Sequence, residues 1–399
     1  MPALLSYSNK YTLTFVSGKG SCRRSWNSCS PPTFSPQPLR RLRTFARVNR
    51  NPNRFTIDTL SKDPIITINQ RSRGGALYLD EEEATLTKFA FFQGRIVPIE
   101  EAKISVMTHT FNYGTGCFEG IRAYWNEAEE QLFVFRMREH YERFLDSMGM
   151  LMMERRHSAD ELGQITLELL RREAYRANAY IRPIAYKADE IIGVRLHGLK
   201  NDVTIWTTPY GGYVQNEEGA RVGFSSWRRI GDNIVPPRGK ITGAYANSAF
   251  IKSEAMLNGF DEALVLSQNG TVSEGSAENV FIVRDGVVIT PPVSEDILEG
   301  ITRATIIELA RAELGMQVIE RPIGRTEFYV ADEAFFTGTG VQIAAIVEVD
   351  HRPLGTGKMG PVVSSIRDLY FDVVRGRERK YRHWCTPVYA DVREPVTIR

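Results

Sequence analysis

The chain has 399 residues, of which 42% are hydrophobic, and a formal net charge of +2. This length is enough to bury a large core and to form two domains. A net charge so near zero gives no overall bias towards nucleic acid or acidic lipid, and no apolar run approaches the roughly 18 residues that a membrane span needs. We therefore expect small-molecule partners, with no nucleic acid and no membrane.

The N-terminal segment differs in composition from the rest of the chain. Residues 1–57 contain ten Lys or Arg residues and no Asp or Glu. The segment is rich in Ser, Arg and Pro and has no hydrophobic period, so we predict a disordered basic leader over residues 1–80. Two interpretations stay open: an organelle transit peptide, or a start codon assigned too far upstream. We predict a cytoplasmic protein, or an organellar one if the leader is a transit peptide.

The first predicted domain, residues 88–213, combines strands and helices. It opens with a hairpin, because residues 91–98 place two short apolar runs around a Gln-Gly turn. Ser158 and Glu161 have the spacing of a capping box at the start of a helix. Further strands are predicted at residues 133–135, 179–186 and 203–207, and helices at residues 138–152 and 158–177.

Residues 214–221 are polar and Gly-rich, which predicts an interdomain linker followed by a larger domain over residues 222–389. Asn-Gly at 269–270 and Asp-Gly at 285–286, each flanked by β-branched runs, indicate tight hairpins. We therefore predict a mixed α/β (α+β) fold whose second domain is built on antiparallel or mixed sheet, and not a doubly wound nucleotide-binding fold. Helices that end before a glycine are predicted at residues 247–258 and 301–314.

Two side chains 34 positions apart suggest the chemistry. Lys240 follows the restricted sequence Pro-Pro-Arg-Gly and can form a Schiff base, while Glu274, in a Ser-Glu-Gly turn expected just after a strand, can charge a pyridine nitrogen. Chemistry on pyridoxal phosphate needs these two groups. Taken singly, both have plainer interpretations, because most lysines are solvated surface charges and most such carboxylates are turn residues. Lys252, beside Glu254 in a predicted helix, is interpreted as a solvated charge of this kind.

Two small-residue segments are candidates for binding a phosphate. Residues 298–303 place a glycine and a hydroxyl at the start of a helix, where free N–H groups favour an anion, and residues 336–340 form a second such loop after a strand. A threonine at a helix start is more often only a cap. Other chemistries find little support: the six histidines have no metal-ligand spacing, and the sequence has neither a G-x-S-x-G elbow nor a C-x-x-C pair.

The order of motifs resembles the class IV aminotransferases, which are pyridoxal-phosphate enzymes of fold type IV, and most closely the branched-chain amino-acid aminotransferases of bacterial type. The resemblance covers residues 89–389, about three quarters of the chain. Its matching strings are residues 113–122, 138–143, 179–183, 240–245, 273–279, 300–303 and 331–339. It implies a smaller N-terminal α/β domain, a larger cofactor-binding domain, and assembly as a homodimer or larger homo-oligomer.

The activity implied by the resemblance is reversible amino transfer between L-Leu, L-Ile or L-Val and 2-oxoglutarate, with glutamate and the 2-oxo acids as the other substrates. A D-amino-acid aminotransferase or an aminodeoxychorismate lyase of the same fold is the alternative. The preference among the three branched side chains stays open, because one methylene changes binding by only about 1–3 kcal/mol.

The resemblance also implies roles for individual residues. Lys240 would hold the cofactor and move the proton at the substrate Cα, Tyr245 would contact the ring hydroxyl, and Glu274 would pair with the ring nitrogen. The phosphate would be bound by Arg143, Ile301, Thr302 and Thr339. The substrate would be bound by Phe118, Gly120, Arg122, Tyr180, Arg182, Tyr210 and Tyr213, with Arg182 receiving the second carboxylate of glutamate. No metal is expected.

Overall fold

The computed structural model describes residues 6–8, 12–14, 87–211 and 219–389. The chain divides into two compact units, Met1–Leu77 and Tyr78–Arg399. In the first unit, β1 (Ser6–Ser8) and β2 (Thr12–Thr14) pair antiparallel. The rest of the predicted leader, and residues 214–218 of the predicted linker, lie outside the described residues, so both predictions stay untested.

An antiparallel sheet forms the first part of the second unit. Its strands follow the order β19-β7-β6-β8-β9-β3-β4, and β5 pairs with β8. The predicted β3–β4 hairpin is confirmed, and Gln93 and Gly94 turn it with φ of 49° and 78°. The strands are β3 (Phe89–Phe92), β4 (Arg95–Pro98), β5 (Gly116–Phe118), β6 (Ile121–Asn126), β7 (Gln131–Phe135), β8 (Ala179–Lys187), β9 (Asn201–Pro209) and β19 (Cys385–Pro387).

Helices α2 (Met137–Met150) and α3 (Ala159–Glu173) pack their apolar sides against this sheet, and the short α1 (His109–Tyr113) precedes β5. The predicted capping box is confirmed, because the Glu161 backbone N–H donates to Ser158 Oγ and the Ser158 N–H donates to the Glu161 carboxylate. Helix α3 ends earlier than residue 177, because Ala174 adopts a left-handed conformation with φ of 57° and closes the helix.

A second, mixed sheet follows the order β12-β11-β10-β17-β16-β13-β14-β15, with β18 on β17. Both predicted hairpins are confirmed, since β11–β12 and β13–β14 are antiparallel. Strand β10 pairs parallel with β11 and β17, and β14 pairs parallel with β15. The strands are β10 (Ala220–Arg228), β11 (Glu262–Leu266), β12 (Val272–Gly275), β13 (Asn279–Arg284), β14 (Val287–Thr290), β15 (Val318–Glu320), β16 (Glu333–Gly338), β17 (Gln342–Val349) and β18 (Arg352–Pro353).

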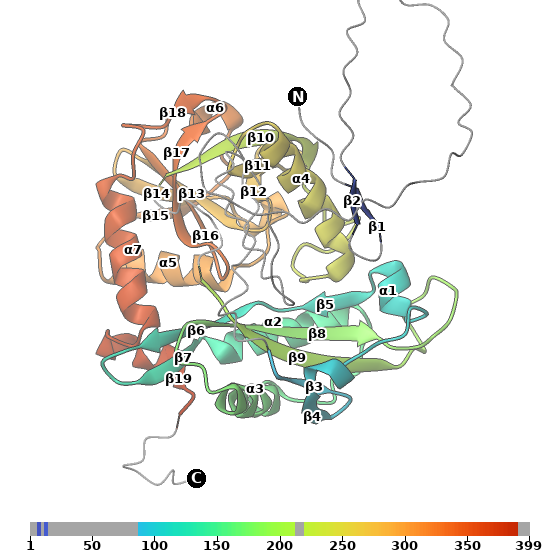
Figure 1. Ribbon diagram of the computed structural model, residues 1–399. Helices are drawn as coiled ribbons and strands as arrows, with labels where there is room; N and C mark the ends of the chain where they lie inside the picture. Colours follow the sequence, from blue (N-terminus) through green and yellow to red (C-terminus); the bar gives the residue numbers. More distant parts are fainter. Residues whose placement is uncertain (1–5, 9–11, 15–86, 212–218, 390–399) are drawn as a thin grey trace, which may run out of the picture. The chain divides into compact units, whose positions relative to one another are not determined.

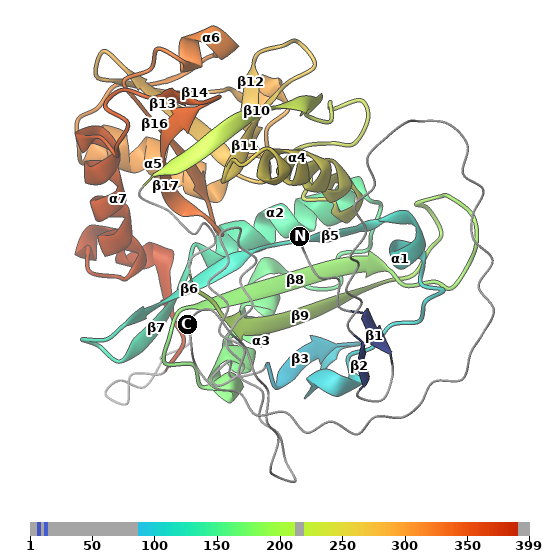
Figure 2. The same cartoon turned by 45° about the horizontal axis from the view of Figure 1, so that its top comes forward.

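The helices of this part are α4 (Tyr245–Leu257), α5 (Ile301–Ala312), α6 (Arg325–Phe328) and α7 (Pro361–Val374). Figure 1 shows α7 beside α5 and α4 beside β10 and β11, and Figure 2 shows the same neighbours from a second direction. None of the helices in the described ranges is long and apolar enough to cross a membrane.

One hydrophobic cluster joins the two sheets. Tyr124 and Phe135 from the antiparallel sheet pack in the same core as Phe281 and Phe335 from the mixed sheet, together with the apolar sides of α5 and α7. Strand β19, from the end of the chain's described part, returns to pair with β7. The predicted division into a domain over residues 88–213 and a domain over residues 222–389 stays a prediction.

Candidate functional site

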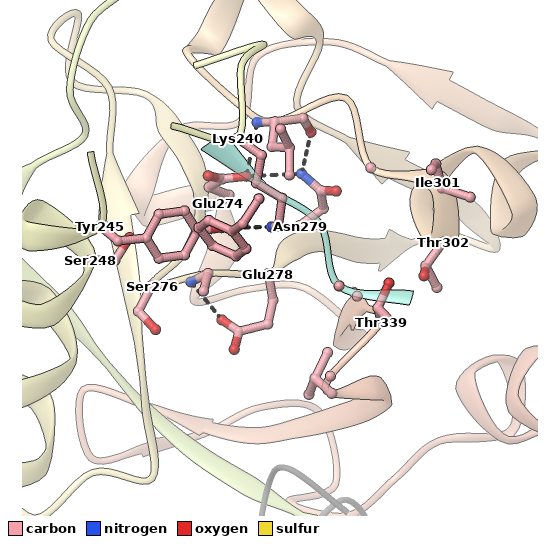
Figure 3. A pocket seen from close by; sticks show the side chains of 18 of the residues that line it. Lys240, Tyr245, Ser248, Glu274, Ser276, Glu278, Asn279, Ile301, Thr302 and Thr339 are labelled. Carbon is pink, nitrogen blue, oxygen red and sulfur yellow. Dashed lines mark hydrogen bonds between the residues drawn. The ribbon is translucent and has the colours of Figure 1, made fainter. Parts of the chain in front are cut away.

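A cavity of about 500 Å³ is lined by residues from both sheets. Figure 3 shows Lys240, Tyr245 and Glu274 in one group, and Ile301, Thr302 and Thr339 apart from them. Of the residues predicted from the sequence, the following line the cavity: Phe118, Gly120, Arg143, Tyr180, Arg182, Tyr210, Lys240, Tyr245, Glu274, Ile301, Thr302 and Thr339. Tyr213 lies outside the described residues, and Arg122 lies behind the lining.

Backbone bonds fix Lys240 at the cavity. Its carbonyl oxygen accepts the N–H of Phe118 at 3.0 Å, and its own N–H donates to Ser147 Oγ at 3.1 Å. The amine Nζ donates to the Tyr245 hydroxyl at 2.6 Å and lies 5.1 Å from the centre of the Phe118 ring. The amine is therefore held at one place beside an aromatic wall, as a covalent tether requires.

Glu274 lies within β12 and not after it, because residues 272–275 continue the antiparallel pairing with β11 and place Glu274 opposite Val265. The prediction that Glu274 follows a strand was therefore wrong, although its side chain still lines the cavity. The carboxylate is 2% exposed and accepts hydrogen bonds from Asn279 Nδ2 at 2.9 Å and from the N–H of Leu298 at 3.2 Å. Burial raises its pKa above the usual value, and the charge of Arg229 opposes this shift.

Arg143, on α2, is bound on three sides. Its Nε and Nη2 donate to the two oxygens of Glu119 at 2.7 and 2.9 Å, and its Nη1 donates to the carbonyl oxygen of Glu299 at 2.8 Å. His140 Nδ1 contacts the same carboxylate at 2.8 Å. Burial alone would raise the pKa of Glu119, but Arg143 and His140 hold it well below the usual value. One N–H on each Nη atom of Arg143 is left for an acceptor in the cavity.

The start of α5 provides further donors for an anion. Gly300 is the N-cap, and the first N–H groups of the helix, on Ile301 and Thr302, have no partner within the helix. A Cβ at Gly300 would collide with Asn279 Oδ1, so only glycine allows this close approach. Thr339, in the turn after β16, lines the same cavity. Together with Arg143, these groups form a site for a phosphate or another anion.

Another part of the cavity lining is aromatic and includes one arginine, Arg182. Arg182 Nη2 donates to the Tyr180 hydroxyl at 2.7 Å, and the guanidinium lies 4.4 Å from the centre of the Phe118 ring. The rings of Tyr180 and Tyr210 are 5.1 Å apart. A Cβ at Gly120 would collide with the Tyr180 hydroxyl, so glycine is needed for this packing. The wall offers an apolar surface with a positive charge on it.

Arg122 is 2% exposed and does not line the cavity. Its guanidinium donates to the carbonyl oxygens of Gly340 at 3.1 Å and Gly211 at 2.5 Å, and it lies 5.1 Å from the centre of the Tyr210 ring. It therefore connects two loops behind the site, and its predicted contact with substrate stays a prediction.

Sequence reasoning missed several residues of the site. Arg229 and Ser248 line the cavity, and Glu119 and His140 lie behind it. Glu119 belongs to a string that carried the family resemblance, but nothing in the sequence pairs it with Arg143. The interpretation of Lys252 as a solvated charge was wrong: its Nζ donates to the carbonyl oxygen of Asp261 at 2.8 Å and pairs with the buried Glu262.

Comparisons with known proteins identify the family of this chain. Residues 116–349 match the family model for amino-transferase class IV. A protein of Aquifex aeolicus described as "Probable branched-chain-amino-acid aminotransferase" is 50% identical over 301 residues, which are 75% of this chain and 97% of that protein.

Two solved structures have the same fold. The branched-chain aminotransferase of Thermoproteus uzoniensis with norvaline is 44% identical, with a TM-score of 0.73 over 76% of this chain and 100% of that one. The T.th. branched-chain amino acid aminotransferase complexed with N-(5'-phosphopyridoxyl)-L-glutamate is 39% identical, with a TM-score of 0.72 over 76% and 99% of the two chains. A family model that matches more than half of the chain, and a relative at this level of identity, lead to one conclusion: the chain belongs to the class IV aminotransferases.

Proposed function

We propose that the protein is a pyridoxal-phosphate-dependent branched-chain amino-acid aminotransferase, which transfers an amino group between L-Leu, L-Ile or L-Val and 2-oxoglutarate. The observation that carries this proposal is the arrangement around one cavity: an amine on Lys240, a buried carboxylate on Glu274 and an anion site at the start of α5. The similar structures with bound norvaline and phosphopyridoxyl-glutamate support the same substrate class.

The residues present fit the cofactor. Arg143 has two free N–H groups, the first turn of α5 has unpaired N–H groups, and Thr302 and Thr339 add hydroxyls, which together suit a phosphate dianion. Burial raises the pKa of Glu274, and the charge of Arg229 opposes this shift, so Arg229 favours the ionised carboxylate that a protonated ring nitrogen needs as a partner. The amine of Lys240 lies in the same cavity.

When bound, pyridoxal phosphate withdraws electrons from the Cα of an amino acid, and it does so best with a protonated ring nitrogen. Lys240 holds or moves the proton at the substrate Cα, and the Tyr245 hydroxyl, 2.6 Å from Nζ, orients the amine. Glu274 keeps the negative charge that the ring nitrogen needs. The Phe118 and Tyr180 rings exclude water from the aliphatic side of the substrate.

One site must bind both an aliphatic side chain and the second carboxylate of glutamate. The aromatic wall binds the aliphatic chain by burial, and Arg182 on this wall binds the carboxylate by a charge-assisted hydrogen bond. Arg182→Ala is therefore expected to slow the half-reaction with glutamate far more than the half-reaction with leucine. Equal losses for both substrates would contradict this assignment.

The test of the function is an absorbance spectrum of the purified protein loaded with pyridoxal phosphate. We expect the band of the bound cofactor to bleach when L-leucine is added and to return with 2-oxoglutarate. Lys240→Ala should lack both the band and the turnover. A band that responds to D-alanine but not to L-leucine, or no band at all, would overturn the proposal.

We propose a homodimer or larger homo-oligomer, in keeping with the resemblance. Exposed apolar side chains support a subunit interface near α1 and the segment after β8: Ile104, Val106, Met107, Phe111, Ile192 and Val194. Sedimentation at several protein concentrations tests this proposal, and a monomer at every concentration would refute it. The compartment, cytoplasmic or organellar if the leader is a transit peptide, stays a prediction.

A further inference from the structure

Arg229, directly after β10, is held against Glu274 on the side of the cavity. Its Nη2 lies 2.7 Å from Glu274 Oε1, and its Nη1 donates to Ser248 Oγ at 3.4 Å. Its backbone N–H donates to the carbonyl oxygen of Leu266 at 2.9 Å, and its own carbonyl oxygen accepts from Gln268 at 2.7 Å. The side chain is 11% exposed, so the guanidinium is largely shielded from water and its position is fixed by the mixed sheet.

The carboxylate of Glu274 can accept one more hydrogen bond. A carboxylate has about four acceptor positions, two on each oxygen. Asn279 Nδ2 and the Leu298 N–H both donate to Oε2, while Arg229 occupies one position on Oε1. Among the described residues, the second position on Oε1 has no hydrogen-bond donor. Asn279 is itself fixed, because its Nδ2 also donates to the carbonyl oxygen of Leu298 at 2.9 Å.

We propose that Arg229 is a positioning residue that keeps the shared proton on the ring nitrogen of the cofactor and off Glu274. The inference rests on the proposed function, since it assumes that pyridoxal phosphate binds with its ring nitrogen at the open position of Glu274. Arg229 is not expected to contact the substrate. It acts on the cofactor through the carboxylate of Glu274.

The direction of the effect follows from electrostatics. The proton shared by the ring nitrogen and Glu274 can lie on either group. On the ring nitrogen it gives an ion pair, with a positive ring and a negative carboxylate, and on Glu274 it leaves both groups neutral. A guanidinium in direct contact with the carboxylate, 2.7 Å from Oε1, stabilises the negative end of the ion pair more than it repels the ring. Without it, burial favours the neutral carboxyl group, and the proton leaves the ring.

Two other cationic side chains also favour the ionised form of Glu274, but neither forms an ion pair with it. Lys240 and Arg303 both lower the pKa of Glu274 through their charges, and each contributes less than Arg229. Arg303 has its own carboxylate, Glu320, at 2.7 Å. In the described part of the chain, Arg229 is the arginine that forms an ion pair with Glu274.

The test reads the proton directly. The protein is loaded with pyridoxal phosphate labelled with ¹⁵N in the ring, and the ¹⁵N chemical shift of the bound cofactor is measured in the native protein, in Arg229→Gln and in Arg228→Gln. Arg228 is the neighbouring residue and is exposed, so it is a matched control for the loss of one positive charge. We expect the protonated signal in the native protein and the control, and the unprotonated signal in Arg229→Gln.

Rates sharpen the test. Arg229→Gln should lower kcat for L-leucine by about 10–100-fold, the range seen when the hydrogen-bond partner of a metal ligand is removed, with cofactor affinity nearly unchanged. Arg229→Lys, which keeps the charge, should keep the protonated signal. A protonated signal in Arg229→Gln, or loss of that signal in Arg229→Lys, would overturn the inference.

Arg229→Met, a second neutral variant, repeats the measurement in case the glutamine variant does not fold. If both neutral variants fold but no longer bind the cofactor, the inference is also overturned, because Arg143, α5 and Lys240 are left intact. If the native protein itself shows no bound cofactor, the proposed function fails first, and the inference fails with it.

Discussion

Two buried carboxylates beside arginines, Glu119 and Glu274, differ in how fully they are paired. Glu119 accepts hydrogen bonds from Nε and Nη2 of Arg143 and also contacts His140, and its pKa is lowered. Glu274 has a single contact with Arg229, and its pKa is raised. A saturated carboxylate can only orient its arginine, whereas an unsaturated one keeps an acceptor for a ligand. We therefore expect Glu119 to serve a structural purpose, by orienting Arg143, and Glu274 to serve a chemical one on the cavity wall.

Neutralising Glu274 should give the largest effect. In Glu274→Gln the ring nitrogen loses its charged partner, so we expect kcat to fall by about 10²–10³-fold, as when a preorganised electrostatic contact is lost. Stopped-flow absorbance of the L-leucine half-reaction measures this. If Glu119→Gln reduced kcat at saturating cofactor as severely as Glu274→Gln does, the contrast between the two carboxylates would be contradicted.

Glu119→Gln should instead weaken cofactor binding. The amide cannot accept both N–H groups of Arg143, so the guanidinium loses its fixed direction towards the phosphate site. A hydrogen bond to a charged group contributes about 1.5–3 kcal/mol, which corresponds to a loss of affinity of roughly 10–100-fold. Equilibrium dialysis with pyridoxal phosphate measures the change, and an unchanged affinity would show that Arg143 needs no support from Glu119.

Glu119 should also contribute to acid sensitivity. Its pKa in the folded protein lies below the unfolded value of about 4.3, so its ion pair stabilises the fold fully above that pH and is lost as the pH falls further. Between pH 5 and pH 3, the free energy of unfolding should fall less steeply in Glu119→Gln than in the native protein. Urea titrations at both pH values measure the slopes, and equal slopes would argue against this contribution.

A third buried carboxylate, Glu278, should give the opposite pH dependence. Burial, with the charge of Glu262 adding to it, raises its pKa to about 8, and one of its oxygens accepts the N–H of Ala277 at 3.0 Å. Because the folded pKa lies above the unfolded one, stability is present below about pH 4.3 and is lost as the pH rises towards 8. Glu278→Gln should lessen this loss, and Tm values at pH 6 and pH 8.5 would detect it. A Tm difference between these pH values that matches the native protein would contradict the prediction.

Local features of the fold were predictable because they depend on neighbouring residues. The Asp-Gly pair at 285–286 turns the β13–β14 hairpin with φ of 50° and 75°, and Ser158 caps α3 as its spacing with Glu161 indicates. The parallel pairs of β10 could not be read in the same way, because turn residues report only on strands that follow each other.

For the site, the sequence by itself supplied Lys240 and Glu274 as the proposed reactive groups, because a Schiff base and a charged partner for a ring nitrogen depend on residue type. Only the tertiary structure decided their partners. Arg229 reaches Glu274 because β11 lies between β10 and β12 in the mixed sheet, and Glu119 meets Arg143 because α2 packs beside β5. The physical reason is that an ion pair depends on distance in space, and sheet order and helix packing set that distance between residues far apart in the chain.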